Sequence, residues 1–109
     1  MNFEEYQKKS RKTAVYPKAG DNVYYPTLGL TGEAGEVANK IKKIMRDKND
    51  QVDDETREIM EGELGDVLWY VAQIATELNL SLDEIAQKNI DKLYSRMERG
   101  KLSGDGDNR

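Results

Sequence analysis

The strongest constraint on this chain is a six-residue phrase that it uses twice. Residues 32–37 read Gly-Glu-Ala-Gly-Glu-Val, and residues 62–67 read Gly-Glu-Leu-Gly-Asp-Val. The phrase contains two acids three residues apart, which are Glu33 and Glu36 in the first copy and Glu63 and Asp66 in the second. Residues three apart share one face of an α-helix. Each copy therefore predicts a helix that presents two carboxylates on one side.

Apolar residues surround both phrases at helical spacing. The first stripe contains Leu30, Ala34, Val37, Ala38, Ile41, Ile44 and Met45, and the second contains Met60, Leu64, Val67, Leu68, Val71, Ile74, Ala75 and Leu78. At about 100° per residue, both acid pairs border their stripe on the same side. If the two helices pack as antiparallel neighbours, the four acids meet at the rim of the core.

Capping and turn signals divide the chain into four predicted helices. These run from Asn2 to about Lys12, from about Tyr25 or Leu28 to Arg46, from Asp53 or Asp54 to about Leu78, and from Ser81 to about Arg99. Asn2 and Ser81 each precede a glutamate by three residues, which is the spacing of a capping box. Gly100 occupies the position after a helix where glycine is favoured. No stretch shows the alternation of a strand.

We therefore predict an all-α fold, an antiparallel bundle of about four helices. Residues 1–100 would form a single domain, and residues 101–109, rich in Gly and Asp, would be a mobile C-terminal tail. A chain of 109 residues buries only a modest core on its own. We expect oligomerisation to complete it.

A loop precedes the second predicted helix and is marked by Pro17, Gly20 and Pro26. Three tyrosines lie in or beside it: Tyr16, Tyr24 and Tyr25. One interpretation is that these rings cover one end of the core. The other is that they form a lid or a base-stacking surface beside the acids.

The composition excludes several kinds of chemistry. The chain has no cysteine and no histidine, so it offers no thiol nucleophile, disulfide, zinc finger or histidine base. A metal site must use oxygen ligands, which suit magnesium, manganese or calcium. A formal charge of −4 argues against a nucleic-acid partner. No apolar run is long enough to span a membrane and no signal-peptide pattern is visible, so we expect a cytoplasmic protein.

Electrostatics favours a cation at the acids. Two carboxylates about 5 Å apart repel by roughly 3 kcal/mol at an effective dielectric constant near 20. A converged cluster therefore needs cations or raised pKa values. Four glycines lie in the same helical turns: Gly32, Gly35, Gly62 and Gly65. Each costs up to about 1 kcal/mol relative to alanine, which close approach of helices or space for a ligand would explain.

The last predicted helix supplies the opposite charge. Asn89, Lys92 and Arg96 border its apolar stripe as the acids border theirs. A basic stripe beside a cation site suits a polyanion such as a phosphate chain. The alternative is an ordinary solvated face whose bases pair with Asp91 and Glu98.

These motifs resemble a known family. Leu-Gly-Leu-Thr-Gly-Glu-Ala-Gly-Glu-Val at 28–37 and Gly-Glu-Leu-Gly-Asp-Val-Leu-Trp-Tyr at 62–70 resemble the MazG-like nucleoside triphosphate pyrophosphohydrolases, an all-α superfamily with E-x-x-E followed by E-x-x-D. Lys-Asn-x-x-Lys-Leu-x-x-Arg at 88–96 is similar to the family's last core helix. The resemblance covers roughly residues 24–109. Many members have a further glutamate where this chain has Gly32.

The resemblance implies hydrolysis of a (deoxy)nucleoside triphosphate to the monophosphate and pyrophosphate, with Mg²⁺ or Mn²⁺ as cofactor. The implied metal ligands and catalytic residues are Glu33, Glu36, Glu63 and Asp66, and the implied substrate-binding residues are Asn89, Lys92, Arg96 and Lys40. One of the glutamates, or the metal, would activate the attacking water. Family members are usually homodimers or homotetramers. The preferred base is not indicated.

Two alternatives stay open at this point. The chain could be a nucleotide-binding regulator without useful catalysis, or a helical oligomerisation module without a ligand. A ferritin-like iron site fits poorly, because the histidines usual at such sites are missing.

Overall fold

The computed structural model describes residues 1–100 together with Gly104 and Gly106. Within these residues, four α-helices follow one another: α1 (Phe3–Arg11), α2 (Tyr24–Asp47), α3 (Asp54–Glu77) and α4 (Leu82–Glu98). No strand occurs among these described residues, so the all-α prediction is confirmed. Apart from the two glycines, the predicted mobile tail at 101–109 lies outside the described residues.

Three of the helices begin at side-chain caps that the sequence indicated. The capping oxygens are those of Asn2, Asp53 and Ser81, which accept the backbone N–H groups of Glu5 at 2.8 Å, Thr56 at 2.8 Å and Glu84 at 3.2 Å. Each cap satisfies a donor that the first turn of a helix otherwise leaves unpaired. The short polar cap signals therefore fix where α1, α3 and α4 begin.

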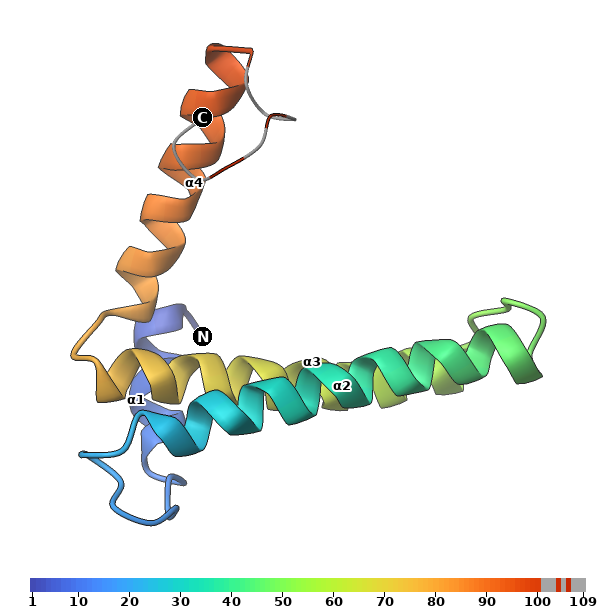
Figure 1. Cartoon of the computed structure of the whole chain (residues 1–109), viewed down its shortest axis with the longest axis horizontal. Coiled ribbons are helices and arrows are strands. Elements are labelled where there is room, and N and C mark those ends of the chain that lie inside the picture. The colour runs from blue at the N-terminus through green and yellow to red at the C-terminus, as the bar shows by residue number, and fades with distance from the viewer. Residues whose placement is uncertain (101–103, 105, 107–109) are drawn as a thin grey trace.

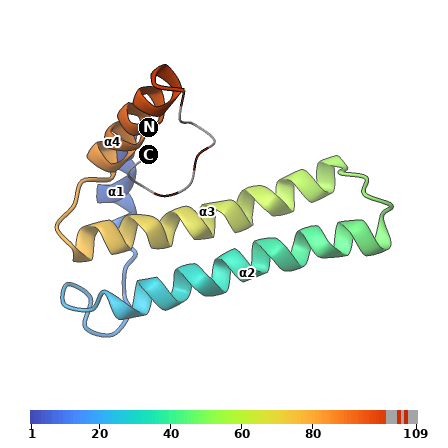
Figure 2. The same cartoon turned by 45° about the horizontal axis from the view of Figure 1, so that its top comes forward.

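The long helices α2 and α3 lie side by side and antiparallel, joined by a short connection at residues 48–53 (Figures 1 and 2). α1 crosses α3 near its C-terminal end, and α4 packs chiefly on α1. Both views show α4 standing away from the α2–α3 pair. The four predicted helices are present, but α4 does not lie along that pair. One chain alone thus leaves the bundle open.

The core lies mainly where α1 and the loop after it cross α3. Its buried apolar side chains are Tyr16, Ile44, Ala72, Ala75 and Leu82. Gln73 is fully buried at the crossing, where it donates to Ser10 Oγ at 3.1 Å and accepts from Arg11 Nη1 at 3.3 Å. No buried side-chain polar atom among the described residues lacks a partner. A satisfied polar network therefore joins α1 to α3.

Much of the predicted apolar stripe is exposed in one chain. Met45 is 69% exposed and Leu64 is 55% exposed, because two helices cover only one side of each stripe. The accessible surface is 8102 Å², whereas a compact monomer of 12.4 kDa exposes about 6,100 Å². In the described part of the chain, no helix combines the length and apolar character needed to span a bilayer.

Candidate metal centre

Three of the four predicted acids converge between α2 and α3. Glu33 projects from α2, and Glu63 and Asp66 project from α3. Each offers a carboxylate oxygen, and these three oxygens all lie within 4.8 Å of one another. The antiparallel packing brings the two copies of the repeated phrase opposite each other, as their helical phase predicted. We call Glu33, Glu63 and Asp66 the acid cluster.

Glu36 lies at the edge of this arrangement. Its side chain is exposed, and it does not belong to the group of converged oxygens. Its charge still acts on Glu33. The pKa of Glu33 is raised above its usual value by partial burial first, and then by the charges of Asp66, Glu63 and Glu36. The cluster thus carries repulsion that a bound cation would relieve.

Lys40 lies beside the acid cluster. Its Nζ lies 4.0 Å from Glu63 Oε1, in a half-exposed position on α2. The sequence marked Lys40 as a phosphate-binding candidate, and the structure pairs it with an acid of the cluster. At this separation and exposure the ion pair is weak, worth at most about 1 kcal/mol.

Two tyrosines border the cluster. The pKa of Tyr70 is raised by burial and by the neighbouring Tyr25, Glu33 and Asp66. The pKa of Tyr6, on α1, is raised by burial and by Asp66. Tyr70 lies one helical turn after Asp66, so helical spacing alone places it on the same side of α3 as the acids. Tyr6 comes from another helix, and only the crossing of α1 over α3 brings it here.

A missing side chain makes room for Tyr70. A Cβ added at Gly29 would lie 2.2 Å from Tyr70 Cε1, so only glycine fits there without movement. Gly29 lies one turn before Glu33, on the face of α2 that meets α3. Because Gly29 lies one turn before Glu33, helical spacing could have placed it on the face of α2 that meets α3. The sequence alone does not say that Tyr70 lies opposite it.

Unlike Gly29, the four glycines of the repeated phrase do not face a side chain of the neighbouring helix. Apart from the adjoining residues and backbone of the same helix, no atom of the described residues lies within 4 Å of a Cβ built at these positions, which are Gly32, Gly35, Gly62 and Gly65. Close approach of α2 and α3 to each other therefore does not explain them. They leave an open surface next to the acid cluster.

The predicted basic stripe lies on α4, which stands away from α2 and α3. Asn89 and Lys92 are exposed, and Arg96 is buried. One chain therefore does not bring its own stripe to its own acid cluster. The sequence could not reveal this, because the direction of α4 depends on the turn after α3 and on α1.

The acid cluster fits a hard divalent cation. All of its donors are carboxylate oxygens, the ligands that Mg²⁺ and Mn²⁺ prefer. At bond lengths near 2.1 Å, adjacent ligands of one Mg²⁺ lie about 3.0 Å apart and opposite ligands about 4.2 Å apart. The three oxygens, which lie within 4.8 Å of one another, reach these spacings by side-chain rotation. The cluster could hold one such ion and leave further coordination positions to water or to phosphate oxygens.

Comparisons with known proteins give a family match. A family model described as "MazG nucleotide pyrophosphohydrolase domain" matches residues 26–100. The "Gene 37 protein" of Mycobacterium phage L5 is 49% identical over 114 aligned residues, which cover 100% of this chain and 100% of that protein. No solved structure gives a significant match.

Proposed function

Because the chain belongs to the family of MazG nucleotide pyrophosphohydrolase domains, we propose that it hydrolyses a (deoxy)nucleoside triphosphate to the monophosphate and pyrophosphate with Mg²⁺. The observation that carries the proposal is the convergence of three carboxylate oxygens from α2 and α3 within 4.8 Å. These residues come from the two motif copies. They provide the oxygen-only site that a magnesium-dependent reaction on phosphates needs.

The residues of the chain then have distinct tasks. Glu33, Glu63 and Asp66 would hold the cation, and the exposed Glu36 would complete its coordination after a change of rotamer. When bound, the cation would neutralise charge on the phosphates and lower the pKa of water. In the reaction a water oxygen bonds to phosphorus, the α–β phosphoanhydride bond breaks, and pyrophosphate leaves. A carboxylate at the edge of the site accepts the proton that the water loses.

The substrate phosphates need cationic partners. Lys40 lies beside the acid cluster in the same chain. We propose that the exposed Asn89 and Lys92 come from α4 of a second copy in a homodimer or homotetramer, whereas Arg96 is buried within its own chain. Two observations support this: the exposed apolar stripes of α2 and α3, and an accessible surface about 2,000 Å² above that of a compact monomer. A surplus of this size is in the range that stable subunit interfaces bury.

A substrate screen tests the proposed reaction. Release of pyrophosphate, converted to phosphate by an added pyrophosphatase, is measured for the eight common nucleoside and deoxynucleoside triphosphates with Mg²⁺ and with Mn²⁺. We expect turnover of at least one substrate and a loss of about 100-fold or more in Glu63→Gln. Glu61→Gln is the matched control, because Glu61 is an exposed acid of α3 outside the cluster. No turnover with either metal, or full turnover in Glu63→Gln, would refute the proposal.

The shared site has its own test. Light scattering should give a dimer or tetramer, and mixing inactive Glu63→Gln chains with inactive Lys92→Met chains should restore part of the activity. Restoration occurs only if one copy supplies the acids and the other supplies α4. A monomer in solution, or mixed oligomers without activity, would show that the site is not shared in this way.

A further inference from the structure

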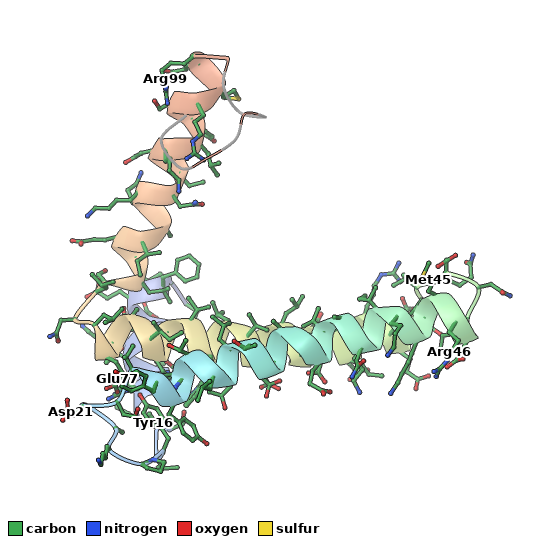
Figure 3. The ribbon with its side chains drawn as sticks, viewed as in Figure 1. Tyr16, Asp21, Met45, Arg46, Glu77 and Arg99 are labelled. Atoms are coloured by element: carbon green, nitrogen blue, oxygen red, sulfur yellow. The ribbon has the colours of Figure 1, made fainter. Side chains whose placement is uncertain are left out.

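Glu77 ends α3 and anchors the loop that leads into α2. Its side chain is only 1% exposed. Four donors bind its carboxylate: Arg11 Nη2 at 2.8 Å, Tyr16 Oη at 2.5 Å and the Gly20 N–H at 2.8 Å donate to Oε2, and the Asn22 N–H at 2.8 Å donates to Oε1. Three of these donors belong to residues 12–23, which we call the N-terminal loop. Figure 3 shows Glu77 and Tyr16 together where this loop meets the end of the α2–α3 pair.

The N-terminal loop reaches the acid cluster through a series of aromatic contacts. Tyr16 stacks on Tyr25 with ring centroids 5.0 Å apart and planes 8° apart. Tyr16 also makes an edge contact with Trp69 at 6.3 Å, and Trp69 makes one with Tyr70 at 5.0 Å. Tyr70 lies one helical turn after Asp66 on α3, and its pKa is raised by burial first and then by Tyr25, Glu33 and Asp66. The four rings, Tyr16, Tyr25, Trp69 and Tyr70, therefore form a continuous aromatic cluster between Glu77 and the acids.

The loop also fixes the start of α2. The backbone N–H of Asn22 donates to Glu77, and its side-chain oxygen accepts the Tyr25 N–H at 3.2 Å. Its side-chain amide donates to the Pro17 carbonyl at 2.8 Å. Val23, immediately before the helix, makes no side-chain cap. The first turn of α2, the helix that carries Glu33, is thus connected to α3 through Asn22 and Glu77.

We propose that Glu77 is a positioning residue for substrate binding: it anchors the N-terminal loop and so fixes the aromatic cluster and the first turn of α2 beside the acid cluster. The proposal rests on the proposed hydrolysis, since it concerns the wall of the same site. Glu77 touches neither the acid cluster nor the metal it would hold. Its loss should therefore weaken substrate binding while the affinity for metal stays the same.

The substitution Glu77→Gln distinguishes the hydrogen bonds that the Glu77 carboxylate accepts from the volume that the side chain fills. Glutamine has almost the same shape, but its amide nitrogen cannot accept a hydrogen bond. Oε2 accepts three donors and Oε1 accepts one. In either amide orientation, at least one donor from the loop or from Arg11 faces an N–H group. A buried donor left unpaired is costly, so the loop is released.

The chain contains its own reporter for loop release. Trp69 is the single tryptophan of the sequence, and its Nε1–H donates to Thr13 Oγ1 of the loop at 2.8 Å. We expect Glu77→Gln to shift the Trp69 emission to longer wavelength and to raise KM by roughly an order of magnitude. We expect kcat to change by less than about twofold, and the Kd for Mn²⁺ in calorimetry to be unchanged. Glu61→Gln, the exposed acid on the same helix, should behave as wild type in all four measurements.

Tyr16→Phe is the second variant, in case Glu77→Gln fails to fold. It removes one donor to Glu77 and keeps the ring that stacks on Tyr25. The same changes should appear at smaller size. Folded variants with wild-type Trp69 emission and KM overturn the proposal, and so does a fall in kcat at constant KM. If the wild-type chain hydrolyses no nucleotide, the proposed function fails, and the Trp69 emission of these variants still decides whether Glu77 anchors the loop.

Discussion

Replacement of Gly29 by alanine measures how tightly Tyr70 packs on α2. The new Cβ would lie 2.2 Å from Cε1 and 2.4 Å from Cζ of the Tyr70 ring. Carbon atoms in contact normally stay about 3.5 Å or more apart, so the ring or the helix must move by roughly 1.3 Å. Overpacking of this kind costs about 1–3 kcal/mol. The better helix propensity of alanine returns up to about 1 kcal/mol.

We therefore expect Gly29→Ala to destabilise the fold by about 1–2 kcal/mol, or roughly 5–15 °C in Tm for a chain of this size. Gly32→Ala is the matched control, because no atom of another described element lies within 4 Å of its added Cβ, and it should be neutral or stabilising by up to about 1 kcal/mol. Thermal unfolding is followed by circular dichroism at several protein concentrations, since subunit association also shifts Tm. If Gly29→Ala is as stable as Gly32→Ala, Tyr70 does not pack over Gly29.

Three further predictions concern pH, helix capping and metal. Burial alone would raise the pKa of Glu77, but hydrogen bonds donated by Asn22, Tyr16, Gly20 and Arg11 lower it from 4.5 to about 2. The ionised Glu77 therefore stabilises the fold fully above pH 4.5, and this stabilisation is lost as the pH falls towards 2. Trp69 emission in wild type should follow that window, and a flat signal would contradict it. Ser81→Ala should cost about 1 kcal/mol in urea unfolding, and Ser81→Gly only a few tenths, because Ser81 caps α4; equal effects would argue against the cap. Mn²⁺ binding at mildly acidic pH should release a proton, since the pKa of Glu33 is raised, and calorimetry in buffers of different ionisation enthalpy should detect the release in wild type but not in Glu33→Gln.

The parts of the structure that depend on local rules could be predicted from the sequence. Asn2, Asp53 and Ser81 mark helix starts through their own backbone contacts, so no distant residue needs to be known. The convergence of Glu33 with Glu63 and Asp66 required only helical phase and antiparallel packing. The repeated phrase gives the helical phase, and antiparallel packing was the assumption added to it. The family assignment rests on the same residues.

The parts that depend on crossing elements could not be predicted. Gln73 is polar and does not continue an apolar stripe, yet the contacts with Ser10 and Arg11 of α1 bury it. No sequence pattern distinguishes Glu77 from other acids at helix ends, and its role depends on a loop that comes more than fifty residues earlier in the chain. The direction of α4 follows from its packing on α1. Periodicity describes one helix at a time and carries no information about such contacts.

Lys40 Nζ lies 4.0 Å from Glu63 Oε1, so a metal ion that binds to the acid cluster must compete with a cation of the chain itself. A divalent ion that bound to the acid cluster would displace the Lys40 ammonium group from Glu63. The fraction of clusters that hold the metal would therefore depend on its competition with this lysine. The lysine stem is flexible and the pair is weak, so the exchange requires no backbone movement. The displaced ammonium stays within reach of any anion that arrives with the metal. The cation would then favour binding of the anion, and the anion would favour binding of the cation to the same extent, because linkage is reciprocal.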